Sequence, residues 1–305
     1  MGDFASGLLL TCTIGLLWSF TGVYYKLMAK WKLNPYDVGI LTGTIGIVVN
    51  LLFVTKTGKF FSGEIPLPSW HYGVFVLFAG FANGWGSYVL QRSMLYGKSG
   101  VTWAIGQCAL IVPFFAITII YSEPWNLLKL SGTAVIAAGM IAVALRNSQK
   151  SSAEAPDPRY GVVLALAAFV ILGGAQSMTS ATSFMSYTDQ GLLRPLITGA
   201  GAVLAAAACK IYLKEKKFYF PKKLIPVIIL LSLQAVLVQV MQFCALDRLK
   251  NCGMNGVFFP IAVGLCIAGY SVWSLLFFKE KCSGLFIGSV AAILFGLGCF
   301  CIADI

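Results

Sequence analysis

The sequence predicts an all-α integral membrane protein with ten transmembrane helices arranged as two inverted five-helix repeats. Hydrophobic residues make up 58% of the 305 residues, charged residues only 11%, and the mean hydropathy is +0.84. A soluble domain carries roughly a quarter charged residues. The apolar residues gather into ten runs of about 20 residues, the length at which a helix crosses a bilayer. Composition therefore predicts the class, and the number of runs predicts the architecture.

The ten runs follow one another with mostly short connections, as antiparallel neighbours in a helical bundle do. They are Ala5–Leu27, Asp37–Thr55, Trp70–Gln91, Val101–Tyr121, Leu127–Leu145, Tyr160–Met185, Leu192–Leu213, Leu224–Leu246, Cys252–Phe278 and Ser283–Ile302.

The chain divides into a first repeat at 1–147, a linker at 148–159 and a second repeat at 160–305. The linker contains serines and prolines, which favour a loop. Three residues of the first half recur at one constant spacing in the second: Glu123, Ile136 and Gly139 as Glu280, Ile293 and Gly296. Because five helices are an odd number, two such repeats must be inverted relative to each other in the membrane.

The basic residues predict the orientation of the chain. Sixteen of the 22 Lys and Arg residues lie at the ends of odd-numbered runs or in the loops that follow them. Cytoplasmic loops carry the excess of Lys and Arg, so these loops are expected in the cytoplasm and both termini outside. We expect a multi-pass protein of the plasma (inner) membrane.

Several functional classes are disfavoured. The formal net charge of +11 comes from loop residues, which indicate topology and contact with the lipid bilayer rather than with nucleic acid. The nine cysteines contain no C-x-x-C pair, and His71 is the one histidine. We therefore expect no metal site, no cofactor and no catalytic residues. A membrane-embedded enzyme would need a nucleophile, a base or a metal cluster, and we do not expect one.

Polar side chains inside the runs predict a lined central cavity. The amides, indoles and one phenol expected to bind a substrate are Trp18, Asn83, Trp85, Gln91, Trp103, Gln107, Gln176, Gln242, Asn255 and Tyr270. In the sixth run, Gln176, Ser180 and Ser183 share one helical face. A single Ser or Thr serves more often as a bond between helices, but so many amides need partners or water.

The predicted substrate is a small neutral polar molecule. No Asp, Glu, Lys or Arg lies in the middle of a run, where an ion pathway or a proton relay would place a carboxylate. Amides can bridge neighbouring hydroxyls and indoles can stack on a sugar ring, so a sugar fits this lining.

The fifth and tenth runs contain few polar residues and are expected at the periphery. The Gly284-x-x-x-Gly288 pattern permits close contact between helices. A monomer and a homodimer through these two helices both remain open.

The chain resembles the drug/metabolite transporter superfamily. Ten spans in two halves carry the likeness, with Ser122-Glu123-Pro124 leading to Gly132 and Gly139. The nearest likeness is to its sugar-uptake branch, typified by the L-rhamnose-proton symporter family. The stretches that carry this second likeness are KLMAKWKLNPYDVGILTGTIG (Lys26–Gly46), Leu77–Pro113, Tyr160–Met185, Gln242 and Lys279–Glu280.

The resemblance implies an alternating-access carrier with a central site formed by helices one to four and six to nine. A secondary-active transporter of a sugar such as a deoxyhexose is the function expected. Symport with a proton or a sodium ion is left open, with Asp37 as the candidate coupling residue. The alternative is an exporter of amino acids or drug-like amphiphiles of the same superfamily, and the direction of transport stays open.

Overall fold

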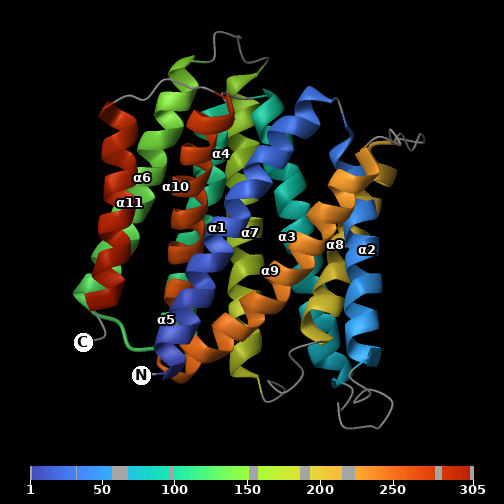
Figure 1. Cartoon of the computed structure of the whole chain (residues 1–305), viewed down its shortest axis with the longest axis horizontal. Coiled ribbons are helices and arrows are strands. Elements are labelled where there is room, and N and C mark those ends of the chain that lie inside the picture. Colours follow the sequence, from blue (N-terminus) through green and yellow to red (C-terminus); the bar gives the residue numbers. More distant parts are fainter. Residues whose placement is uncertain are drawn as a thin grey trace.

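The computed structural model describes residues 2–31, 33–56, 68–96, 99–150, 157–185, 193–214, 224–278 and 284–302, and this part of the chain is all-α (Figure 1). Its elements are α1 (Gly2–Lys30), α2 (Pro35–Lys56), α3 (Trp70–Tyr96), α4 (Ser99–Gln107), η1 (Cys108–Leu110), α5 (Ile111–Ile120), α6 (Leu127–Lys150), α7 (Pro158–Ala181), η2 (Thr182–Phe184), α8 (Leu193–Tyr212), α9 (Ile225–Asn251), η5 (Asn255–Val257), α10 (Phe258–Phe278) and α11 (Gly284–Ile302).

A helix covers each predicted run. Within the described ranges, six helices are long and apolar enough to cross a membrane, namely those that contain the first, second, third, sixth, seventh and eighth runs. In the other four runs the apolar helical stretches found among the described residues are shorter, 10–17 residues each. The length and composition of these helices are those of a multi-pass helical membrane protein.

Two runs are irregular in a way that hydropathy does not predict. The fourth is divided between α4 and α5 by the 3-10 turn η1, and the ninth begins with the 3-10 turn η5. The predicted linker is also partly helical: α6 continues to Lys150, and α7 begins at Pro158. Asp157 caps α7, because its carboxylate accepts the Tyr160 N–H at 3.0 Å and Pro158 occupies the first turn.

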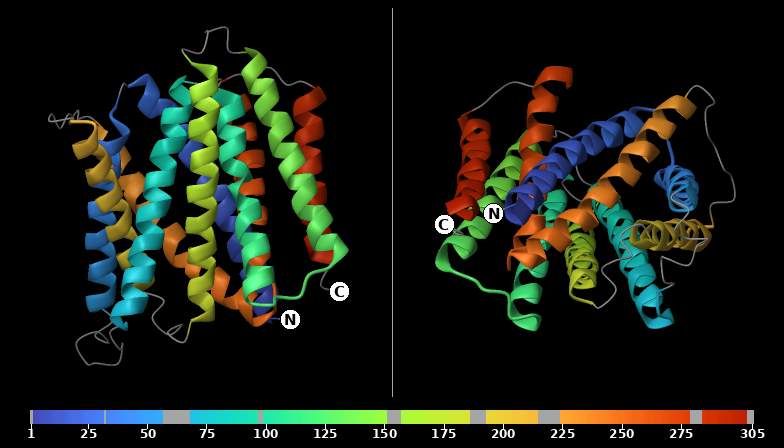
Figure 2. Two further views of the ribbon diagram at one scale, coloured as in Figure 1. Left: turned by 180° about the vertical axis from the view of Figure 1, so that it is seen from behind. Right: turned by 60° about the horizontal axis from the view of Figure 1, so that its bottom comes forward.

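The helices form one bundle with two distinct edges. The helices α6 and α11 pack against each other at one edge, and α2 packs against α8 and α9 at the other. Between them, α3 contacts both α7 and α8, and α1 contacts both α9 and α10 (Figure 2). The first residues of α1 and the last of α11 lie at the same end of the bundle.

The predicted peripheral position of the fifth and tenth runs agrees with the α6–α11 edge. A Cβ at Gly132 would lie 2.9 Å from the Gly296 carbonyl oxygen, so these two glycines let the backbones approach closely. Gly288 faces open space, with no atom within 4 Å of a Cβ built there. Gly132 and Gly296 thus make the close contact between α6 and α11 inside one chain, and Gly288 takes no part in that contact.

Glycines also bring α3 against α8. A Cβ at Gly80 would overlap the Thr198 carbonyl oxygen, and one at Gly201 would overlap that of Leu77. Only residues without a side chain allow this approach. We call this glycine contact the α3–α8 seam. It fixes how α3 is rotated about its axis, and therefore which of its side chains face the inside of the bundle.

Candidate functional site

The rotation of α3 turns Asn83 inward. Successive residues of a helix are about 100° apart, which places Asn83 on the arc between two packed faces. On one side Gly86 meets Leu172 of α7, and on the other Gly84 meets α8. Asn83 is nevertheless exposed. An exposed side chain on an inward arc, halfway along α3, indicates an accessible space inside the bundle.

The helix α9 faces the inside in the same manner. Gln234 donates to the Leu17 carbonyl oxygen of α1 at 2.5 Å, and Val236 packs beside Gly46 of α2. The arc between these contacts carries Ala235 and Gln242. Ala235 is exposed at mid-helix, as Asn83 is, and Gln242 is half-buried. The helix α9 thus places Gln242, a predicted substrate-binding residue, on the same inward arc as the exposed Ala235.

The polar stripe of α7 faces inward as well. Leu172 packs on α3 and Gly173 lies against Val112 of α5. The arc between these two positions carries Gln176, Ser180 and Ser183. Their side-chain oxygens are buried and accept or donate no hydrogen bond among the described residues. The stripe predicted from spacing is therefore a stripe of unsatisfied polar atoms.

Two aromatic residues complete this inner surface. Trp18 lies on α1 between the positions that meet α9 and α10, with its ring edge-on to Phe258 at 6.4 Å between centroids. Tyr270 of α10 is half-buried and lies on the arc away from the exposed Val272 and Leu276. Five of the ten predicted substrate-binding residues thus face the inside of the bundle: Trp18, Asn83, Gln176, Gln242 and Tyr270.

Trp85 lies on the opposite side of α3. It stacks on Phe81 at 5.8 Å between ring centroids, and Phe81 stacks on Phe78, which is exposed. These three rings form a row along the outer face of the helix. Bulky aromatic side chains on that face suit contact with lipid.

The remaining predicted residues have less distinctive surroundings. Gln91 and Gln107 are half-buried, and Gln107 is the last residue of α4 before the η1 turn. Trp103 is partly buried against two apolar clusters. The roles predicted for these three residues stay predictions.

Asn255 belongs to a capped turn. Its backbone N–H donates to Glu123 Oε1 at 2.5 Å, and the Gly256 N–H donates to Glu123 Oε2 at 2.7 Å. Its Nδ2 donates to the Leu246 carbonyl oxygen at 2.9 Å, and its buried Oδ1 has no partner in the described part of the chain. Glu123 thus accepts hydrogen bonds from the first N–H groups of the continuous helical segment formed by η5 and α10, as an N-terminal cap does.

Burial raises the pKa of the Glu123 carboxyl, and the two N–H donors and nearby Lys129 oppose that rise. Lys129 is itself buried and donates to the Pro124 carbonyl oxygen at 2.9 Å. The segment between α5 and α6 is therefore tied to the start of α10 by a carboxylate. From the sequence, Glu123 was a repeat position and part of the Ser122-Glu123-Pro124 stretch, and no capping role was predicted for it.

Asp37, the predicted coupling residue, is buried at the start of α2. Its carboxylate forms an ion pair with Lys210 near the end of α8. The pair joins two helices at the end of the bundle opposite the first residues of α1.

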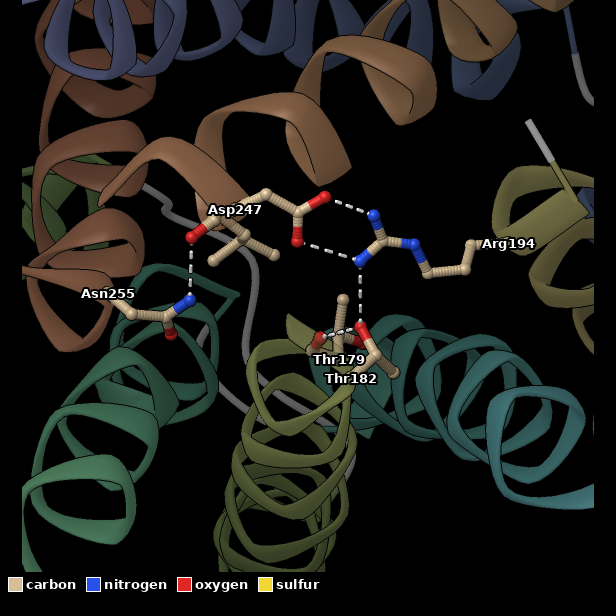
Figure 3. A network of polar contacts seen from close by, with 6 residues as sticks. Thr179, Thr182, Arg194, Asp247 and Asn255 are labelled. Atoms are coloured by element: carbon tan, nitrogen blue, oxygen red, sulfur yellow. Dashed lines mark hydrogen bonds and ion pairs between the residues drawn. The ribbon is translucent and has the colours of Figure 1, made fainter. Parts of the chain in front are cut away.

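A buried ion pair that the sequence analysis did not predict lies at the other end of the same helix. Arg194, in the first turn of α8, is completely buried and Asp247 of α9 is 27% exposed. Both Nη atoms of Arg194 donate to the Asp247 carboxylate, Nη1 to Oδ1 at 3.0 Å (Figure 3). Nη1 also reaches Thr182 Oγ1 at 3.5 Å, and the guanidinium lies 4.8 Å from the centre of the Phe243 ring.

The sequence contained a signal for this pair. Arg194 begins one predicted helix and Asp247 ends the next, and antiparallel neighbours bring such positions to the same face of a bundle. Neither residue is among the site residues predicted from the sequence. In the described part of the chain, no group of three His, Cys, Asp or Glu residues is placed to hold a metal ion.

No protein-family model matches the chain, and no curated protein matches it in sequence. A solved crystal structure of a protein is similar over 96% of this chain and 97% of that chain, with a TM-score of 0.72 and 16% sequence identity. At this identity the likeness shows that the two proteins share a fold, and nothing about a shared activity.

Proposed function

We propose that this chain is a secondary-active transporter that moves a small neutral polar metabolite by alternating access. The proposal rests on the positions of Asn83, Gln176 and Gln242, which come from three different helices and lie on arcs that face the inside of a membrane-type bundle. Amides at membrane depth need hydrogen-bonding partners, and a polar cargo supplies them.

The charges of the bundle support a neutral cargo. Arg194 is paired with Asp247 and Lys210 with Asp37, so each of these two cations has its own carboxylate. The inward arcs carry amides, hydroxyls and aromatic rings. A sugar such as a deoxyhexose has hydroxyls for the amides and an apolar ring face for Trp18 and Tyr270.

Internal symmetry supports the transport mechanism. The stretch Leu90-x-Arg92-x₄-Gly97-x₂-Gly100-Val101 recurs as Leu246-x-Arg248-x₄-Gly253-x₂-Gly256-Val257. The contacts follow the same relation: the third span packs on the sixth (α3 on α7), and the eighth packs on the first (α9 on α1). We infer from these relations that the halves are inverted repeats, an arrangement that suits rocking of one half against the other around a central site.

The coupling ion of the proposed symport is a proton or a sodium ion, with the Asp37 carboxylate as the group that would respond to it. Binding of the ion at the Asp37 carboxylate would compete with Lys210 and loosen the contact between α2 and α8. The proposed location is the plasma (inner) membrane with both termini outside, as a monomer or as a homodimer through α6 and α11.

Uptake into proteoliposomes tests the proposal. Gln242→Ala and Asn83→Ala are expected to reduce uptake of a radiolabelled deoxyhexose at least tenfold while the midpoint of thermal unfolding changes little. Leu237→Ala, on the exposed membrane-facing arc of α9, is the matched control and keeps wild-type uptake. Wild-type rates in both amide variants would refute the central site. Uptake or efflux of amino acids, with none of sugars, would favour the exporter.

A further inference from the structure

The outer aromatic row of α3 leads to a basic residue. Phe78, Phe81 and Trp85 form that row, and Arg92 follows Trp85 by seven residues. Seven residues are close to two helical turns, so Arg92 lies on the same outward face. Its side chain is half-buried, and Leu95 in the next turn is 72% exposed. The outward face of α3 therefore changes from apolar rings to a positive charge near the end of the helix.

Tyrosines from three helices surround the Arg92 guanidinium. It lies 5.9 Å from the centre of the Tyr96 ring and forms a hydrogen bond with the Tyr96 side chain. Tyr160, in the first turn of α7, meets Tyr96 edge-on at 5.0 Å between ring centroids. Tyr160 and Tyr36, which is at the start of α2, also interact with the guanidinium electrostatically. This is the end of the bundle where α3 stops and α2 and α7 begin, opposite the first residues of α1 (Figure 2).

The charges at this end leave a net positive charge. No carboxylate in the described part of the chain forms an ion pair with Arg92. Asp37 of α2 is bound to Lys210 instead, and Asp157 caps the first turn of α7. Two residues after that cap, Arg159 adds a second, exposed positive charge. The two arginines therefore exceed the one carboxylate that is not already paired with a cation.

A phosphate ester with apolar chains fits this arrangement. A guanidinium binds phosphate oxygens at two points, and phenolic hydroxyls donate hydrogen bonds to them. At 1.5 Å per residue, Trp85 is about 10 Å and Phe81 about 16 Å from Arg92 along the helix axis. Half of a bilayer's hydrocarbon core is about 15 Å thick, so the rings lie at the depth of the acyl chains in one leaflet. A phospholipid uses both the charge and the aromatic row, whereas free phosphate uses only the charge.

We propose that Arg92, with Tyr96 and Tyr160, binds the phosphate headgroup of an anionic phospholipid whose acyl chains lie along the row from Phe78 to Trp85. In the proposed orientation this end of the bundle is cytoplasmic, and the cytoplasmic leaflet has the negative surface potential that attracts basic side chains. The site lies on the outside of the bundle. It is therefore separate from the inner surface proposed to bind substrate.

Lipid-dependent thermal unfolding of the full chain in detergent micelles tests the site, because a bound lipid stabilises the folded state by mass action. The probes are phosphatidylglycerol, phosphatidylcholine and inorganic phosphate. Phosphatidylglycerol should raise the unfolding midpoint of the wild-type protein more than phosphatidylcholine does, and inorganic phosphate should not raise it. Equal shifts with the two lipids, or the same shift with inorganic phosphate, would overturn the lipid site.

Substitution of the arginine tests its role. Arg92→Gln should weaken the apparent affinity for phosphatidylglycerol about fivefold, the effect of one basic side chain near an anionic surface. Arg248→Gln is the matched control, because Arg248 is an exposed arginine at the equivalent position of the repeated stretch and lies near the end of α9. Wild-type affinity in Arg92→Gln, or the same loss in both variants, would refute the assignment.

A second measurement does not require Arg92→Gln to fold. The protein is reconstituted in phosphatidylcholine vesicles that contain a minor fraction of brominated phosphatidylglycerol or of brominated phosphatidylcholine, since bromine quenches tryptophan fluorescence on contact. The emission of Trp85 is the difference between the wild-type and Trp85→Phe proteins. Brominated phosphatidylglycerol should quench this difference more strongly than the brominated neutral lipid. Equal quenching by both lipids would overturn the site. Neither measurement involves transport, so both are independent of the proposed function.

Discussion

Arg194 and Asp247 form a two-point ion pair between the first turn of α8 and the last turns of α9. The arginine is completely buried, and it also contacts Thr182 beyond α7 and the ring of Phe243. One charged side chain therefore holds three segments together at one end of the bundle. Lys210, near the other end of α8, pairs with Asp37 of α2. The helix α8 is thus tied by a cation at both of its ends.

Loss of Asp247 should destabilise the protein strongly. Asp247→Ala leaves a buried guanidinium without its counter-charge, and breaking a buried pair in this way costs about 3–5 kcal/mol. The measurement is the free energy of unfolding by denaturant in detergent micelles. Arg248→Ala, at the exposed next position, should change it by less than about 0.5 kcal/mol. Equal effects of the two substitutions would contradict the buried pair.

The α3–α8 seam should not tolerate a methyl group. Gly201→Ala would place a Cβ against the backbone of α3 at Leu77 and Phe81, where neither helix can yield without moving. Overpacking of this kind costs about 1–3 kcal/mol or more. Gly174→Ala is the control, because nothing lies within 4 Å of its Cβ position. A lower midpoint of thermal unfolding in Gly201→Ala alone would support the close packing of α3 on α8. An unchanged midpoint in both variants would disprove it.

Filling the inner space should stop transport without unfolding the protein. Ala235→Phe places a ring on the inward arc of α9, where the alanine is exposed, and should reduce uptake at least tenfold. Leu237→Phe places the same ring on the membrane-facing arc and should leave uptake unchanged. Uptake by reconstituted protein is compared at matched protein amounts. The inner space would be refuted if both variants transported at the wild-type rate.

The Glu123 cap should make stability depend on pH. Burial raises the pKa of Glu123, so the folded protein holds this proton more tightly than the unfolded chain does. This carboxyl contributes most to the free energy of unfolding below its ordinary pKa of about 4.3, and its contribution falls as pH rises through the raised value.

The substitution Glu123→Gln should remove this part of the pH dependence, since the amide does not titrate. It keeps one acceptor oxygen for the N–H groups of Asn255 and Gly256. Glu123→Ala loses both and should lower the free energy of unfolding by a further ~1 kcal/mol, the usual cost of a lost cap. Unfolding curves between pH 4 and pH 8 give both quantities. An identical pH profile in the wild-type and Gln proteins would show that Glu123 does not titrate as described.

The sequence by itself determined the membrane class, the ten helical runs and the polar stripe of α7. These depend on the transfer of apolar side chains out of water and on the 3.6-residue helical period, which act within each run. The stripe Gln176, Ser180 and Ser183 was predicted from spacing alone, and it proved to be a row of buried, unsatisfied atoms.

The tertiary structure alone decided which arc of each helix faces its neighbours. Asn83 and Trp85 are two residues apart on one polar-looking helix, yet glycine contacts of α3 turn the first inward and leave the second in an outer aromatic row. The Arg194–Asp247 pair joins residues 53 positions apart, and Glu123 caps a helix 132 positions away. Local composition carries no information on such pairings, because they depend on close packing between whole helices.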